Sequence, residues 1–198
     1  MAFENLHDVL VDNLKDLLHA EKQLVKALPK LARSASSPDL REALEEHLEV
    51  TKNQVTRLEE VFSSIGEPAK TKKCLGMEGL VAEGEEALED KKESAPAALD
   101  AAIIVAAQKV EHYEISAYGS VRAFANILGY EPAAQLLQQT LDEESEADEK
   151  LTHLAEKINA SAASEGSEEE EAVEVEARTG TTGSRSRNSR SRATARSR

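Results

Sequence analysis

Two carboxylates stand in a segment of the chain that is otherwise rich in Ile, Val and Ala. The stretch QKVEHYEISAYG, residues 108–119, carries Glu111 and Glu114 on or beside an apolar stripe that runs from Ile104 to Tyr118. A carboxylate buried without a partner is costly in its ionised form, unless a cation lies beside it. Carboxylate oxygens are also the hard ligands that many divalent metal ions bind. The pattern therefore indicates a cation site, provided that other segments contribute similar groups.

The same kind of interruption occurs in three further segments with helical spacing. Acids interrupt the apolar stripes of residues 4–34 and 132–160, and a His, a Thr and an amide interrupt the stripe of residues 37–66. Oxygen and imidazole ligands of this kind suit iron and related divalent ions. The candidate metal ligands are Glu21, Glu111, Glu144, Glu114, Gln54, His47 and Asp148.

Four long helices must position these groups. Apolar residues recur at the 3/4 spacing over about residues 4–34, 37–66, 96–128 and 132–160. Ser37 and Pro38 are typical of a helix start, and Gly66 and Gly129 of a helix end. The turns near residues 35 and 130 are short, whereas residues 67–95 form a long connection that includes a short helix. The sequence predicts an all-α, ferritin-like four-helix bundle of two antiparallel hairpins with a long crossover.

Counting from the two short turns predicts that the candidates share one level of the bundle. Glu21 lies about 14 residues before the turn at 35, and Gln54 about 19 residues after it. Glu111 likewise precedes the turn near 130 by about 19 residues, and Glu144 follows it by about 14. At a rise of about 1.5 Å per residue, these positions lie within about a turn or so of one another.

Two interpretations stay open at this point. Each acid taken alone is more often a solvated or ion-paired helix residue, and Gln54, Thr51 and Gln108 can form a hydrogen-bond network without any metal. The coincidence of level across four helices instead favours one or two bound metal ions, with iron the expected element.

The chain changes character after Ala160. Residues 161–198 contain 7 acids and 7 arginines, so residues 1–160 hold the whole net charge of −14. We expect two parts: a helical bundle over residues 1–160, and a disordered tail over 161–198 that is first acidic and then rich in Arg and Ser. The seven arginines could contact nucleic acid through its phosphates. The neighbouring acid block and the acidic bundle oppose such a contact, and the tail could instead fold back on the bundle.

No membrane partner is expected. The longest apolar run, residues 101–107, is far too short to cross a bilayer, and the first residues show no signal-peptide pattern. The single cysteine, Cys74, excludes an internal disulfide and is read as a structural thiol. A cytoplasmic protein is the simplest expectation.

Several stretches together resemble the YciE/YciF-like stress-protein family. They are HAEKQLVKALPKLA, HLEVTKNQVTRLE, KKCLGMEGL, AAQKVEHYEISAYGSV and LLQQTLDEESEADEKLTHLA, and the resemblance covers about residues 4–158 in order. It implies a ferritin-like fold, a homodimer and a dinuclear metal site like that of rubrerythrin-type proteins, with no established activity. It further implies that Glu21, Glu111 and Glu144 are metal ligands, with Glu114, Gln54, His47 and Asp148 as their neighbours.

The chain also departs from the di-iron pattern. A Glu-x-x-His spacing is expected on two of the helices, yet Ala147 stands three residues after Glu144. Val50 occupies an inward position where the resembling family has a carboxylate. We therefore expect fewer ligands and weaker binding than in a working ferroxidase, with a single metal or none as further outcomes.

Three functions follow as hypotheses, and enzymatic activity is left open. The first is a stress-associated protein with an iron site. The second is a non-catalytic helical scaffold whose interior polar groups form only hydrogen bonds and ion pairs. The third is electrostatic contact of the Arg-rich tail with nucleic acid or a partner.

Overall fold

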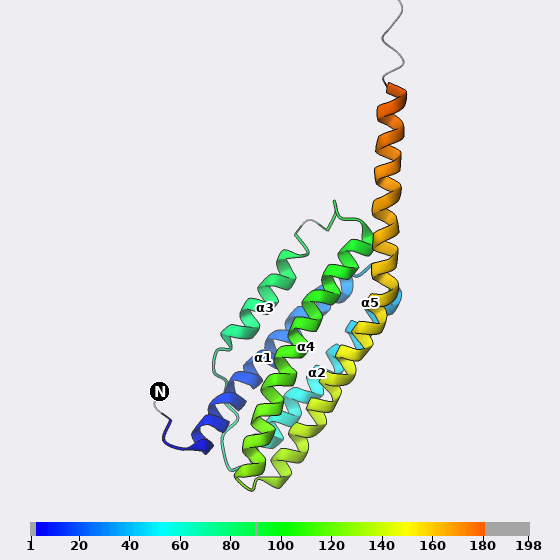
Figure 1. Ribbon diagram of the computed structural model, residues 1–198. Coiled ribbons are helices and arrows are strands. Elements are labelled where there is room, and N and C mark those ends of the chain that lie inside the picture. Colours follow the sequence, from blue (N-terminus) through cyan, green and yellow to red (C-terminus); the bar gives the residue numbers. More distant parts are fainter. Residues whose placement is uncertain (1–2, 90, 181–198) are drawn as a thin grey trace, which may run out of the picture. The chain divides into compact units, whose positions relative to one another are not determined.

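The computed structural model describes residues 3–89 and 91–180 and contains five helices there, without any strand among those residues (Figure 1). The helices are α1 (Leu6–Ser34), α2 (Pro38–Ser64), α3 (Leu75–Glu86), α4 (Pro96–Ile127) and α5 (Glu131–Gly180). Helices α1 and α2 form one antiparallel hairpin, and α4 and α5 form the other. The predicted all-α, ferritin-like architecture is confirmed, and α3 lies in the crossover between the hairpins.

Local chemistry sets the ends of these helices. The Asn5 side chain accepts a hydrogen bond from the backbone N–H of Asp8 at 3.0 Å and caps α1, and the Ser37 hydroxyl caps α2 by accepting from Leu40 N–H at 3.3 Å. Gly66 and Gly129 follow α2 and α4 with φ of 75°, a left-handed conformation that residues with a Cβ rarely adopt. The helix start predicted at Ser37 and the helix ends predicted at Gly66 and Gly129 are therefore confirmed.

A carboxylate of the other hairpin holds the turn between α1 and α2 in place. Asp100 on α4 is buried, and its carboxylate accepts the backbone N–H groups of Ser36 and Ser37, both at 2.7 Å. Because both donors are main-chain groups of the turn, this contact ties the start of α2 to the start of α4.

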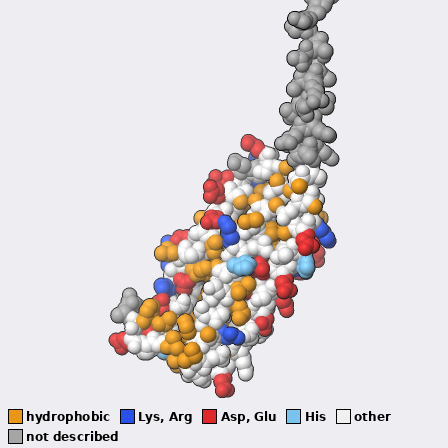
Figure 2. All heavy atoms as spheres, in the orientation of Figure 1, with side chains coloured by type: hydrophobic (Ala, Val, Ile, Leu, Met, Phe, Trp, Pro, Cys, Tyr) orange, Lys and Arg blue, Asp and Glu red, His pale blue; other side chains and the backbone are white. Residues whose placement is uncertain are grey.

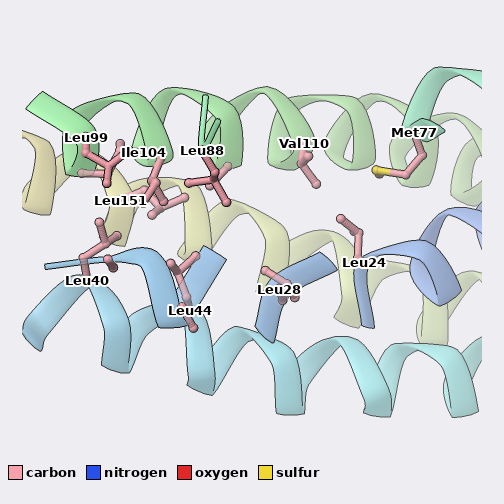
Figure 3. Packing of buried hydrophobic residues seen from close by; sticks show 14 of the residues in the cluster. Leu24, Leu28, Leu40, Leu44, Met77, Leu88, Leu99, Ile104, Val110 and Leu151 are labelled. Atoms are coloured by element: carbon pink, nitrogen blue, oxygen red, sulfur yellow. The ribbon is translucent and has the colours of Figure 1, made fainter. Parts of the chain in front are cut away.

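Two apolar clusters fill the bundle. The cluster in Figure 3 joins the end of α1, the start of α2, the first half of α4 and part of α5, and includes Leu24, Leu28, Leu40, Leu44, Ile104 and Leu151. The second cluster lies toward the opposite end of the helices and includes Leu10, Leu14, Leu58, Phe62, Val121 and Leu137. On α2, α4 and α5 an interval with polar residues separates the two clusters along the chain, whereas on α1 the clusters adjoin at Leu18 and Ala20.

Helix α3 closes one side of the bundle, where it packs against α1 and α4. Its N-cap is Cys74, whose Sγ accepts from Met77 N–H at 3.4 Å and lies 3.0 Å from the Tyr113 hydroxyl. That hydroxyl also donates to Asp16 on α1 at 2.8 Å. The cysteine therefore has a structural place at the start of the crossover helix, as the sequence suggested.

Helix α5 is longer than the sequence predicted. It continues to Gly180 through the acidic block, where the sequence predicted an end near Ala160 and no regular structure beyond it. Glu and Ala have high helix propensity, so a segment with little to bury can still be helical. The first compact unit ends at Ala162, and residues from Ala163 onward form a separate unit. The Arg- and Ser-rich stretch of the predicted tail, from residue 181, lies outside the described residues.

Within the described part of the chain, no helix is both long enough and apolar enough to span a bilayer.

Candidate metal centre

Six buried polar side chains lie between the two apolar clusters, and we call them the polar layer. Each of the four long helices contributes at least one member, and all six side chains are nearly or fully inaccessible to solvent. The two clusters consist of apolar side chains that exclude water, which leaves this layer as the buried polar part of the bundle. The members are Glu21, Thr51, Gln54, Glu111, Glu114 and Glu144.

Three carboxylates of this layer meet one imidazole. One candidate ligand atom from each of His47, Glu111, Glu114 and Glu144 lies within 4.8 Å of the other three. The His47 Nε2 is 3.4 Å from Glu111 Oε1. The group thus joins α2, α4 and α5, and we call these four residues the ligand group.

Glu21 lies beside the ligand group rather than within it. The hydroxyl of Tyr118 on α4 donates a hydrogen bond to its Oε1. Burial raises the pKa of Glu21 well above its ordinary value, and the charge of Glu144 raises it further. Glu21 is therefore close enough to Glu144 to share its electrostatic environment.

Gln54 holds one member of the ligand group in place. Its amide donates to Glu144 Oε1 at 2.6 Å and to Glu143 Oε2 at 3.1 Å. The Arg57 guanidinium contacts both oxygens of Glu143, at 2.7 and 2.8 Å. An amide that donates to Glu144 leaves the second oxygen of that carboxylate available for another partner, so Gln54 is placed as a positioning residue.

Asp148 is not brought into the ligand group. Its carboxylate accepts from the Gln108 amide at 3.1 Å and lies 3.4 Å from His112 Nε2, whose side chain is exposed. Gln108 also donates to Thr152 at 2.9 Å. Asp148 therefore belongs to a bridge between α4 and α5 at the edge of the bundle, where its hydrogen bonds are already provided.

The ligand group and Glu21 lack counter-charge. Among the described residues, five buried carboxylate oxygens have no hydrogen-bond partner: Glu21 Oε2, Glu111 Oε2, Glu114 Oε1, Glu114 Oε2 and Glu144 Oε2. Native structures rarely leave such atoms unpaired without a reason, which includes a bound ion.

The same shortage of positive charge changes the acid–base behaviour of the site. Burial raises the pKa of Glu111 and Glu114 well above the ordinary value, with further contributions from the charges of Glu144 and Glu21 respectively. Burial raises the pKa of Glu144 to about 7. Burial lowers the pKa of His47 to about 4, so the imidazole is neutral at pH 7 and its nitrogen can act as a ligand.

These residues fit a divalent metal ion. Carboxylate oxygens with one neutral imidazole are a donor set used by iron, manganese and zinc. The unpartnered oxygens offer lone pairs that the protein does not use. The ligand group would hold the ion, with Glu21 and Gln54 at its border.

Val50 and Ala147 stand where further ligands were expected, and both line a cavity of about 210 Å³ next to His47 and Glu111. Neither side chain can coordinate an ion. The structure therefore places empty volume, rather than a carboxylate or a second His, on this side of the ligand group.

Two contacts of the site escaped sequence reasoning. The sequence predicts Glu143 only as a solvated or ion-paired acid, and the structure adds its partners, Arg57 in an ion pair and the Gln54 amide. Arg57 and Gln54 are three residues apart on α2, a spacing that puts both on one face and could have suggested a shared partner.

Comparison with known proteins gives one consistent relationship. A family described as a domain of unknown function, DUF892, matches residues 5–164. Protein YciF of Escherichia coli (strain K12) is 46% identical over 156 residues, which are 78% of this chain and 93% of YciF. The crystal structure of the E. coli stress protein YciF gives a TM-score of 0.77 at 44% identity and covers 80% of this chain and 99% of its own. The structure of YcfI, described as a "putative structural protein" from Rhodopseudomonas palustris, gives a TM-score of 0.72 at 38% identity. The match covers 75% of this chain and 94% of the YcfI chain.

Proposed function

The chain belongs to the DUF892 family of YciF-like proteins, and on that premise we propose that its ligand group binds a divalent metal ion, with iron the leading candidate. One observation carries the proposal: in the described part of the chain, five buried carboxylate oxygens lack a hydrogen-bond donor next to a neutral imidazole, at one level of the bundle. The E. coli relative is described as a stress protein, and we carry that role to this chain only as part of the same proposal.

Charge balance supports one or two ions. Four buried carboxylates, those of Glu21 and the ligand group, would carry four negative charges when ionised, and Arg57 is already engaged with Glu143. Without a cation, such groups avoid the desolvation cost by staying protonated. Divalent ions would neutralise the ionised form inside the apolar surroundings.

The chain's own residues have separate tasks in this arrangement. Glu111, Glu114, Glu144 and His47 would provide the ligand atoms, and the two apolar clusters exclude bulk water from both sides. Gln54 orients Glu144, and Tyr118 holds Glu21 through its hydroxyl hydrogen bond. Bound iron would supply electron exchange with oxygen or peroxide, chemistry that suits a stress protein.

The decisive experiment is metal content after anaerobic Fe(II) loading and desalting, measured by mass spectrometry. The wild type is compared with the triple variant Glu111→Gln, Glu114→Gln, Glu144→Gln. A matched control replaces three exposed acids, Glu60, Glu149 and Glu156, by Gln. We expect one or two irons per chain in the wild type and the control, and none in the buried triple variant. Absence of iron from the wild type would rule out iron as the bound ion, and equal iron in the buried variant would rule out the proposed ligand group.

A metal-free scaffold is the second candidate, and the hydrogen bonds of the polar layer favour it. Protonated carboxylates that accept from Tyr118 and Gln54 can stay buried without any ion. Val50 and Ala147 supply no ligand on the side of the cavity. In this case the melting temperature would not respond to added Fe(II), Mn(II) or Zn(II).

The homodimer and the nucleic-acid contact stay predictions. Sedimentation of the full chain would measure the first. Binding of DNA by the full chain and by a chain ending at residue 177, over a range of salt concentrations, would measure the second.

A further inference from the structure

A pocket between α2 and α5 leads from the surface to the ligand group. It has a volume of about 210 Å³, and we call it the α2–α5 pocket. Its floor includes His47 and Glu111, whose side chains are 11% and 3% exposed. Glu114 and Glu144 do not line it. Solvent that fills the pocket therefore meets the ligand group first at His47 and Glu111.

The walls of the pocket hold no ligand atoms. They are formed by small or aliphatic side chains, among them Val50, Ala147 and Leu151. Val50 and Ala147 are only half-buried, because the pocket leaves them in contact with solvent. A larger side chain at either position would take up the space.

The rim of the pocket is acidic. Glu46 forms an ion pair with Lys150 and Glu143 forms one with Arg57, so the net negative charge of the rim comes from Glu146. Acidic side chains also lie along the edge that α5 forms in Figure 2. A net negative charge at the mouth of a pocket raises the local concentration of cations, so this rim favours cations over anions.

The size of the pocket suits a hydrated ion. A volume of about 210 Å³ is about seven times the ~30 Å³ that one water molecule occupies in the liquid. A divalent cation of the size of Fe(II) or Mg(II) carries about six waters in its first shell. The pocket is thus large enough for such an ion before any water is lost.

From this combination we propose that the α2–α5 pocket is the access site for a hydrated divalent cation, with His47 and Glu111 as the first protein ligands to replace its waters. The proposal rests on the metal site proposed above. It assigns Val50 and Ala147 a role as the residues that keep the path open, and it assigns Glu46, Glu146 and Lys150 control over the rate of loading.

The test measures the rate of anaerobic Co(II) loading by its visible absorption in a stopped-flow instrument. Val50→Phe fills the pocket, and Val81→Phe is the matched control, since Val81 is also half-buried but borders a different pocket between α3 and α1. We expect Val50→Phe to slow loading by about tenfold or more, because a close-packed interior leaves no other room for a hydrated ion. Release into a chelator should slow by the same factor, so that the Kd is unchanged. Val81→Phe should load like the wild type.

Charge variants at the rim test the same path without filling it. Lys150→Gln should load about two- to fivefold faster at low ionic strength, and Glu146→Gln slower by a similar factor, with both effects reduced by added salt. These side chains are exposed, so the fold is retained.

The outcomes separate the two proposals. If the wild type takes up no Co(II) and no Fe(II), the metal site itself is wrong. If the wild type loads and the pocket variants and rim variants all load at its rate, only the access proposal is overturned. If Val50→Phe loses bound metal at equilibrium while both rim variants load at the wild-type rate, Val50 affects the site directly and the access proposal is also overturned.

Discussion

Tyr118 on α4 donates its hydroxyl hydrogen bond to Glu21 on α1, and both side chains are fully buried. The bond ties the two hairpins together at the level of the polar layer. It also gives Glu21 one satisfied oxygen, while the other has no partner among the described residues. A hydrogen bond to a carboxylate favours its ionised form, so Tyr118 opposes the rise in the pKa of Glu21 that burial causes.

Replacing Tyr118 by Phe should therefore destabilise the metal-free protein and weaken metal binding. We expect a loss of about 1–3 kcal/mol in the free energy of unfolding at pH 8, the range for a buried polar group left without its partner. Urea unfolding measures this loss. Tyr130→Phe is the control, because the Tyr130 hydroxyl lies 3.1 Å from His7 Nδ1 in a part-buried position. Equal losses in the two variants would show that the Tyr118–Glu21 bond has no special weight.

The stability of the metal-free protein should fall as the pH rises from 6.5 through about 7. The pKa of Glu144 is raised from an ordinary value of 4.5 to about 7, so its contribution is complete below pH 4.5 and is lost as the pH rises through about 7. Glu21, Glu111 and Glu114 have pKa values raised in the same direction and extend the effect. Thermal unfolding across this pH range measures the slope.

His47 acts in the opposite direction but in a different window. Its pKa is lowered from 6.5 to about 4, so the unfolded chain binds more protons between these values and the native state loses stability as the pH falls through them. Above pH 6.5 the contribution of His47 fades as the unfolded imidazole loses its proton, so the raised pKa values of the buried carboxylates dominate there. With metal bound the slope should reverse, because ionised carboxylates bind the ion more tightly as the pH rises. A metal-free protein whose stability rises from pH 6.5 to 8.5 would contradict the assignment.

Glu114→Gln should stabilise the metal-free protein at pH 8. Both oxygens of Glu114 are buried without a hydrogen-bond donor in the described structure, and its carboxyl lies beside that of Glu21, so ionisation at this position is especially costly. A neutral amide avoids the cost of ionisation, and we expect a gain of about 1–3 kcal/mol in urea unfolding at pH 8. At pH 5 the gain should vanish, because Glu114 is then protonated in the native state. Metal affinity should drop at the same time, whereas the exposed control Glu60→Gln should change neither quantity.

Much of this site could be predicted from the sequence, because helix periodicity and turn positions fix both face and level. Glu21, Gln54, Glu111 and Glu144 are brought to one layer as the residue count from the two turns requires. Rotamers and local partners are not contained in that count. Asp148 follows Glu144 by four residues on the same stripe, yet its carboxylate is held by Gln108 at the edge of the bundle.

His47, in contrast to Asp148, is a predicted candidate that the structure does bring into the ligand group. It lies one turn before Thr51 on α2, its side chain is only 11% exposed, and the length of the imidazole lets Nε2 approach Glu111 on α4. The extent of α5 beyond Ala160 also escaped prediction, since the composition of the acid block indicates how little it can bury but not whether its backbone is helical.

Two glycines of α3 should respond in opposite ways to replacement by Ala. A Cβ on Gly76 would lie 2.8 Å from Cε2 of Tyr113, whereas a Cβ on Gly79 would have nothing within 4 Å. Gly79→Ala should stabilise the protein by up to about 1 kcal/mol, the difference in helix propensity. Gly76→Ala has to displace the Tyr113 ring, which is held by its bond to Asp16 and its contact with Cys74, and should cost about 1–3 kcal/mol. Urea unfolding of both variants measures the difference. If Gly76→Ala is as stable as Gly79→Ala, the close packing of the crossover helix on Tyr113 is not what fixes α3 to the bundle.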